Sequence, residues 1–162
     1  MIRKAVEKDI LGIRVLAEAT LHQTMAATQV ENPAYIDRTL ERIYSKDKLR
    51  RSINSQGTTI LVAEKDDKIV GLCQFGSPLI DECEDRKEIH RLLVHPDYCR
   101  QGIGTQFVEA VEDELSEDVD VARVSVYVNP SDMARIRFFT TLGFHHEATE
   151  DKDDEWYLEL EL

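Results

Sequence analysis

The sequence contains few of the residues that mark cross-linked or metal-bound domains. Its only cysteines are Cys73, Cys83 and Cys99, which are widely spaced and form no Cys-x-x-Cys pair. Neither a disulfide framework nor a zinc site is therefore indicated, and we expect no bound metal. Because reduced thiols are typical of the cytosol, we predict a cytoplasmic protein.

The chain also lacks long apolar segments and an excess of basic residues. Its apolar runs are far shorter than the roughly 20 residues that cross a membrane, and its start lacks the basic and apolar regions of a signal peptide. The acidic residues number 32 and the basic ones 20, which gives a formal net charge of -12. Because binding to phosphate backbones requires a basic face, we expect neither nucleic acid nor a membrane as a partner.

At 162 residues the chain is long enough for one core, and we predict a single domain over residues 1–162. The acidic composition has two interpretations. The carboxylates keep the protein soluble, or they attract a cationic amine substrate. The same two interpretations hold for the acidic loop over residues 77–86, which carries Asp81, Glu82, Glu84 and Asp85.

Hydrophobic periodicity predicts a mixed α/β fold. The expected helices are residues 6–25, 35–44 continued after a turn by 47–53, 102–115 and 132–142. The expected strands are residues 2–5, 58–64, 68–75, 87–94, 121–128, 144–148 and 156–162. In the last strand, Trp156, Leu158 and Leu160 alternate with Tyr157 and Glu159, which predicts one buried face and one wetter face.

Residues 88–105 carry a buried-strand pattern into a glycine turn and then into an amphipathic helix. Gly102 and Gly104 remove side chains that would hold a ligand away from the backbone. The first N–H groups of the following helix have no partner within the helix, and such a helix start attracts anions. Arg100 adds a full positive charge, so we expect an anion site at this turn.

The spacing of this turn excludes the two best-known phosphate motifs. No lysine follows Gly104, as a P-loop requires, and Phe107 stands where the dinucleotide fingerprint has its third glycine. The remaining pattern, Arg-Gln-Gly-Ile-Gly at residues 100–104 after Val-His-Pro-Asp-Tyr, closely resembles the acyl-CoA pyrophosphate loop of the GNAT family of N-acetyltransferases. Residues 1–10, 68–75 and 129–144 resemble three further landmarks of that family, in the same order along the chain.

The resemblance implies a mostly antiparallel central sheet of about seven strands, flanked by about four helices. It also implies an acetyl-CoA-dependent N-acetyltransferase that moves an acetyl group to a primary amine. A small amine or polyamine is the preferred acceptor. The alternatives are a peptide acceptor, through its N-terminus or a lysine, and a catalytically weak acyl-CoA-binding sensor. Dimers are common in the family, so a homodimer is possible.

The resemblance also assigns roles to residues. Glu88 corresponds to the glutamate that accepts the proton of the amine, and His90 shares its face of the strand, so the pair would jointly conduct that proton. A purely structural interpretation has both as strand residues hydrogen-bonded to neighbours. The segment that holds the pantetheine arm through its backbone corresponds to Leu92, Leu93 and Val94. The pyrophosphate loop corresponds to Cys99, Arg100, Gln101, Gly102, Ile103, Gly104 and Thr105.

Three positions depart from the family pattern. Cys99 replaces the usual Arg or Gln, and Asp132 replaces the usual Asn beside the cofactor. Phe139 occupies the position of the tyrosine that protonates the leaving thiolate, and its side chain has no proton to give. We expect Asp132 and Phe139 to lie beside the cofactor, and solvent or Tyr127 to supply the missing proton.

Overall fold

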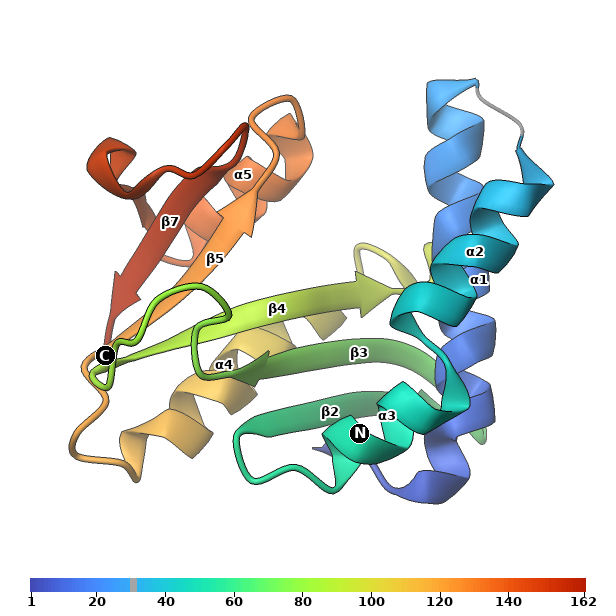
Figure 1. Cartoon of the computed structure of the whole chain (residues 1–162), viewed down its shortest axis with the longest axis horizontal. Helices are drawn as coiled ribbons and strands as arrows, with labels where there is room; N and C mark the ends of the chain where they lie inside the picture. The colour runs from blue at the N-terminus through green and yellow to red at the C-terminus, as the bar shows by residue number, and fades with distance from the viewer. Residues whose placement is uncertain (30–31) are drawn as a thin grey trace. The chain divides into compact units, whose positions relative to one another are not determined.

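The computed structural model describes residues 1–29 and 32–162 (Figure 1). The strands are β1 (Ile2–Lys4), β2 (Thr58–Lys65), β3 (Lys68–Gly76), β4 (Arg86–Val94), β5 (Arg123–Val128), β6 (His145–His146) and β7 (Trp156–Glu161). The α-helices are α1 (Ile10–Thr28), α2 (Pro33–Ile43), α3 (Lys46–Ile53), α4 (Ile103–Ser116) and α5 (Met133–Thr141), and 3-10 turns form η1 (Glu7–Asp9), η2 (Pro96–Tyr98) and η3 (Ala148–Glu150). No helix in these described ranges is both long and apolar enough to cross a bilayer.

The strands form one seven-stranded sheet in the order β1-β2-β3-β4-β5-β7-β6. Strands β4 and β5 are parallel, with Glu88 opposite Ser125, whereas β1 with β2, β5 with β7 and β6 with β7 are antiparallel. The predicted mixed α/β fold with a mostly antiparallel sheet is therefore confirmed. The four predicted helices are also present when α2 and α3 are counted as one helix interrupted by a turn.

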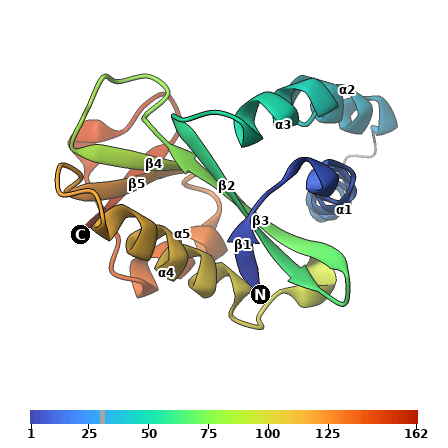
Figure 2. The ribbon, with the colours of Figure 1, turned by 90° about the horizontal axis from the view of Figure 1, so that it is seen from below.

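The chain forms two compact units, Met1–Gln74 with Arg91–Phe107 and Phe75–His90 with Val108–Leu162. In the first unit, α1, α2 and α3 gather on one face of β2 and β3 (Figures 1 and 2). Their apolar stripes meet the inward side chains of the strands in one core, whose buried members include Ile13, Leu16, Ala17, Leu40, Leu49, Val62 and Leu72. This packing is what makes short amphipathic helices stable.

Local sequence signals define the elements of the first unit. Pro33 stands at the start of α2, where its missing N–H costs nothing. The Ser45 hydroxyl accepts a hydrogen bond from the Lys48 N–H at 3.3 Å and caps α3, which separates this helix from α2. Asp66 and Asp67 both have positive φ angles, 52° and 58°, as the central residues of a tight β2–β3 hairpin turn require.

The start of α4 lies close against β3 because Gly71 has no side chain. A Cβ atom at Gly71 would come within 2.7 Å of Phe107 Cε2 and 3.2 Å of Ile103 Cγ2. Phe107 itself is completely buried. The glycine therefore lets the first turn of α4, and the glycine turn before it, sit against the strand.

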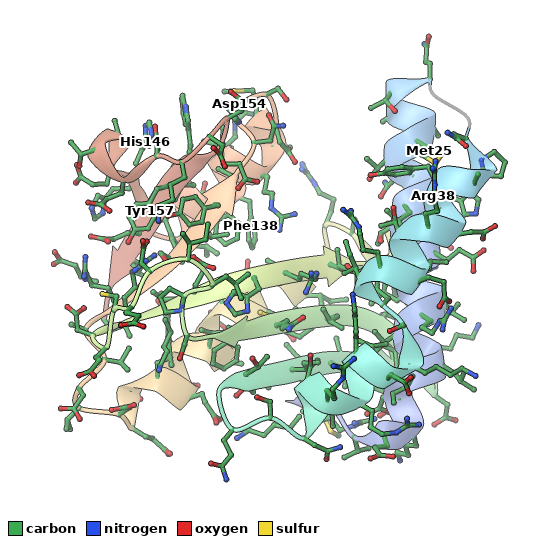
Figure 3. The ribbon with its side chains drawn as sticks, in the orientation of Figure 1. Met25, Arg38, Phe138, His146, Asp154 and Tyr157 are labelled. Atoms are coloured by element: carbon green, nitrogen blue, oxygen red, sulfur yellow. The ribbon has the colours of Figure 1, made fainter. Side chains whose placement is uncertain are left out.

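In the second unit, β7 differs from the prediction. Tyr157 and Glu159 are only 2% and 7% exposed, so the predicted wetter face is wrong. The Tyr157 ring lies under the guanidinium of Arg86 at 5.2 Å, and its hydroxyl donates to Glu159 at 2.5 Å. Arg123 pairs with the same carboxylate at 3.1 Å. Charged partners on neighbouring strands, which alternation along one strand cannot reveal, cover this face. Tyr157 is labelled in Figure 3.

The strand predicted over residues 144–148 is shorter in the structure. The strand covers only His145 and His146 among the described residues, although the Glu147 N–H still donates to the Tyr157 carbonyl of β7 at 3.0 Å. The chain then enters η3, where the Glu150 N–H donates to the Glu147 carbonyl at 3.0 Å. His146 stacks on Trp156 with ring centroids 4.2 Å apart and pairs with Asp151 at 3.0 Å. These contacts hold the turn that carries Lys152, whose ammonium group pairs with Asp81 in the loop after β3.

Candidate functional site

The predicted anion-binding turn connects η2 to α4 in the first unit. Arg100 and Gly102 adopt left-handed backbone conformations, with φ angles of 64° and 82°. A Cβ atom at Gly102 would meet nothing within 4 Å, so the backbone there faces open space. The Gln106 N–H donates to the Gly102 carbonyl at 3.0 Å, which leaves the N–H groups of residues 103–105 available at the helix start. The turn therefore fits a phosphate group.

Two cations flank this turn. Arg100 is exposed and pairs with no carboxylate in the described part of the chain. Lys65, at the end of β2, donates to Gln101 Oε1 at 3.2 Å and lies 5.5 Å from the centre of the Tyr98 ring. The sequence analysis did not identify Lys65, because only the fold brings the hairpin next to the turn. Together the two cations would favour an anion here.

The residues predicted to hold the pantetheine arm lie just before the turn. Leu92 is 8% exposed, and Leu93 packs against the helical core of the first unit. The predicted role of Leu92, Leu93 and Val94 uses their backbone, so their apolar side chains are free to pack. Cys99 directs its thiol at the carbonyl oxygens of His95 and Val94, at 3.5 and 3.8 Å.

Glu88, the predicted base, is a buried carboxylate on β4 in the second unit. It is 6% exposed, with Oε2 3.5 Å from His90 Nε2 and Oε1 3.8 Å from Arg86 Nη1. Burial raises the pKa of Glu88, against the opposing effects of the Arg86 charge and a hydrogen bond from the Leu79 backbone. A raised pKa makes an ionised carboxylate a stronger base than a carboxylate in water.

His90 lies between Glu88 and the loop that follows β3. Its Nε2 is 3.0 Å from the Ser77 carbonyl oxygen. Because a carbonyl can only accept, this ring nitrogen carries the proton in that contact. His90 thus ties the loop to the strand, and the same Nε2 lies 3.5 Å from Glu88 Oε2.

A chain of charged groups adjoins Glu88. Arg86, which is 4% exposed, donates to Ser125 Oγ at 2.7 Å and to Asp81 Oδ2 at 3.2 Å. Lys152 donates to the same Asp81 oxygen at 2.5 Å, and this hydrogen bond is the main reason that the pKa of Asp81 is lowered. Arg86 stands two residues before Glu88, so strand alternation could have revealed it. Lys152 comes from a turn 71 residues further along the chain than Asp81, and no sequence pattern indicated that it would lie here.

Tyr127 contributes a buried hydroxyl to the same unit. Its oxygen has no hydrogen-bond partner among the described residues, and its ring lies edge-on to Tyr157 with centroids 5.5 Å apart. Burial raises the pKa of Tyr127, whereas the positive charges of Lys152 and Arg86 lower it. A buried polar group without a partner is rare in native structures, so this O–H is an available proton donor.

The loop between β3 and β4 lines an open, mainly acidic pocket of about 560 Å³. The pocket is lined by Ser77, Pro78, Asp81, Glu82, Cys83, Glu84 and Lys87. Asp81 is paired with Lys152 and Arg86, whereas Glu82 and Glu84 make no ion pair in the described residues. The lining thus carries three carboxylates and one cation, Lys87.

Asp132 and Phe139 have structural partners of their own. Asp132 Oδ1 accepts a hydrogen bond from the Arg135 N–H at 3.1 Å and caps α5. Phe139 is completely buried and packs edge-on against Phe138 and Phe144, at 5.0 and 5.1 Å between ring centroids. Their predicted cofactor contacts therefore rest on the family resemblance alone. Across residues 1–29 and 32–162, no group of three or more His, Cys, Asp or Glu side chains is arranged to hold a metal ion.

Residues 19–158 match the family model described as "Acetyltransferase (GNAT) domain". The PaiA N-acetyltransferase of Thermoplasma acidophilum, solved with coenzyme A, is similar in structure, with a TM-score of 0.85, 22% identity, and coverage of 100% of this chain and 98% of that one. The ribosomal-protein-S18-alanine N-acetyltransferase of Escherichia coli is similar with a TM-score of 0.69, 18% identity, and coverage of 99% and 92%. No curated protein matches the sequence. At these identities the solved structures establish a shared fold.

Proposed function

The chain belongs to the GNAT family of acetyltransferases, which act with coenzyme A, and from this premise we propose that it moves an acetyl group from acetyl-CoA to a primary amine, with small amines or polyamines preferred. The observation that carries this proposal is Glu88. It is a buried carboxylate with a raised pKa on β4, the strand that leads into the open glycine turn.

The glycine turn would hold the pyrophosphate of acetyl-CoA. The N–H groups of Ile103, Gly104 and Thr105 would donate to it, supported by the charges of Arg100 and Lys65. The backbone of residues 92–94 would hold the pantetheine arm and polarise the thioester carbonyl. Bound acetyl-CoA supplies an activated acetyl group.

Glu88 would remove the proton that prevents the amine from acting as a nucleophile. An alkyl amine with a pKa near 10.4 is neutralised at pH 7 at a cost of about 3.4 pKa units, or roughly 4.6 kcal/mol. Once Glu88 holds that proton, the neutral nitrogen would attack the thioester carbonyl and form the C–N bond. The C–S bond would then break, the nitrogen would release its second proton, and the sulfur would take up one proton. The products are an acetylated amine and the free thiol of coenzyme A.

Charge favours a cationic acceptor. The loop pocket is lined by three carboxylates and one cation, Lys87, and the chain as a whole carries a formal net charge of -12. Such a field raises the local concentration of cationic amines. These groups would also distinguish a polyamine from an acceptor with one charge, because a second ammonium group would gain from the same carboxylates.

Two other functions have specific support. A protein N-terminus is a possible acceptor, since the E. coli neighbour is a ribosomal-protein-alanine N-acetyltransferase and an α-amine with a pKa near 8 needs less help from a base. A catalytically weak acyl-CoA sensor is supported by the departures at Cys99, Asp132 and Phe139.

A thiol-release assay with polyamines, amino acids and short peptides tests the proposal. We expect the highest kcat/KM with a polyamine. A higher value with an alanine-terminated peptide would favour the N-terminal function. If acetyl-CoA raises the Tm of the protein but no acceptor is turned over, the acyl-CoA sensor is the correct function.

Replacing Tyr127 with phenylalanine tests the source of the final proton. We expect kcat to fall by at most about 30-fold at pH 7, because a free thiolate with a pKa near 8.5 is only about 2 kcal/mol uphill there. The Tm should stay the same or rise, because the variant removes an unpaired buried hydroxyl. An unchanged kcat would assign this proton to solvent, and a large loss of Tm would make the tyrosine structural.

A further inference from the structure

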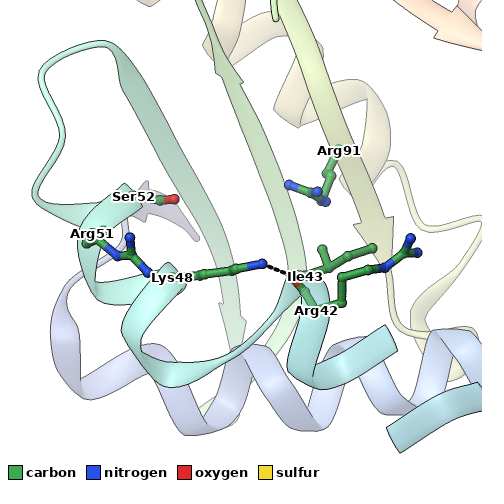
Figure 4. A pocket seen from close by; sticks show the side chains of 6 residues that line it. All are labelled: Arg42, Ile43, Lys48, Arg51, Ser52 and Arg91. Atoms are coloured by element: carbon green, nitrogen blue, oxygen red, sulfur yellow. Dashed lines mark hydrogen bonds between the residues drawn. The ribbon is translucent and has the colours of Figure 1, made fainter. Parts of the chain in front are cut away.

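A second pocket, of about 310 Å³, lies in the first compact unit and is basic. It is lined by Arg42, Ile43, Lys48, Arg51, Ser52 and Arg91. These residues come from the end of α2, from α3 and from β4, so three elements contribute to one cavity (Figure 4). The proposed acetyl transfer uses none of them.

The four cations of this pocket lack negative partners. Lys48 Nζ donates to the Arg42 carbonyl oxygen, and Arg51 Nε reaches the Asp47 carbonyl oxygen at 3.4 Å. Within residues 1–29 and 32–162, none of the four makes an ion pair. In contrast, the adjacent Arg50 lies outside the lining and pairs with both Glu7 and Asp47.

Unpaired cations around one cavity are unexpected in this chain. Acidic residues outnumber basic ones by 32 to 20, so carboxylates are the commoner charge with which a cation could pair. Like charges that converge on one pocket repel each other. An anion in the pocket would remove this repulsion.

Helix dipoles account for only part of the arrangement. Arg42 and Arg51 lie in the last turns of α2 and α3, where a cation is favourable. Lys48 lies in the first turn of α3, where the dipole disfavours a cation, and Arg91 lies on a strand. The dipole therefore explains two of the four charges.

The pocket is also preorganised for an oxyanion. The guanidinium of Arg91 is held by Gln74 Oε1, at 2.9 Å from Nη1, and by the buried ring of Tyr44, 5.6 Å away. An arginine fixed in this way presents its other N–H groups as a planar fork that matches two phosphate oxygens. The Ser52 hydroxyl lines the same space and makes no hydrogen bond to another described residue.

From these contacts we propose that the pocket binds a compact polyphosphate or phosphate ester. One carboxylate would neutralise a single cation of four, whereas a phosphate monoester carries about -1.5 to -2 charges at pH 7 and offers three acceptor oxygens. Acetyl-CoA itself carries phosphate, so the experiment must separate this pocket from the glycine turn.

Isothermal titration with sodium tripolyphosphate tests this site. In protein saturated with acetyl-CoA, which covers the glycine turn, we expect one saturable tripolyphosphate site per chain; free protein would bind tripolyphosphate at the glycine turn as well. The variants Arg42→Gln and Arg91→Gln should each weaken binding at least about tenfold, the effect expected for losing a charge-assisted hydrogen bond.

The control is Arg38→Gln. Arg38 lies on α2 one turn before Arg42, outside the pocket lining (Figure 3). Its variant removes the same charge from the same helix and should leave tripolyphosphate affinity unchanged. The proposal is overturned if no saturable binding occurs, if acetyl-CoA abolishes binding, or if Arg38→Gln weakens it as much as the pocket variants do. None of these readouts requires acetyl transfer.

Discussion

Replacing Glu88 with glutamine should lower kcat about 100-fold at pH 7, within the range usual for a general base. Glutamine keeps the size of the side chain but cannot take the proton of the amine. The difference in kcat between the variant and the unmodified enzyme should shrink as the pH approaches 10.4, where a growing share of the amine is already neutral. In the unmodified enzyme the rate should fall as the pH drops through the pKa of Glu88, which lies above the usual 4.5 because of burial. The measurement is a pH–rate profile for both proteins.

The matched control for this change is Glu159→Gln. Glu159 is equally buried, at 7% exposed, and lies in the same compact unit, but its partners are Tyr157 and Arg123. Its loss should reduce stability and leave the shape of the pH–rate profile unchanged. If both variants shared the profile of the unmodified enzyme, Glu88 would not be the base.

Replacing Gly102 with alanine should raise the KM for acetyl-CoA about 30-fold. A side chain is strained at a φ angle of 82°, and its methyl group would enter the open space into which the N–H groups of the turn face. Displacing a phosphate from such donors loses charge-assisted hydrogen bonds worth about 1.5–3 kcal/mol, which sets this magnitude. The measurement is the KM for acetyl-CoA at saturating amine.

The variant Gly143→Ala separates backbone strain from loss of cofactor binding. Gly143 also has a positive φ angle, 96°, but a Cβ atom there would face Leu160 at 3.3 Å. This variant should lower the Tm by about as much as Gly102→Ala does, and it should leave the KM for acetyl-CoA unchanged. An equal rise of KM in both variants would show that strain, rather than the glycine turn, controls binding.

Features that depend on neighbouring residues were predictable from the sequence. The periods of apolar residues defined the helices and strands, because each repeats along its own segment. The glycine turn over residues 100–104 was predictable for the same reason, since its conformation and its free N–H groups belong to consecutive residues. The family resemblance then singled out Glu88 within that same stretch of chain.

Features that depend on distant partners were decided by the tertiary structure. Lys152 reaches Asp81 from 71 residues away, Tyr157 and Glu159 are buried by charges on other strands, and Arg91 joins Lys48 at the basic pocket only through the fold. A sequence pattern records the period of one element, whereas burial and charge pairing are properties of the surfaces that meet. The sequence alone thus determined the elements, the glycine turn and the family, and the fold decided which charges surround Glu88, which hydroxyl has no partner and where the cations gather.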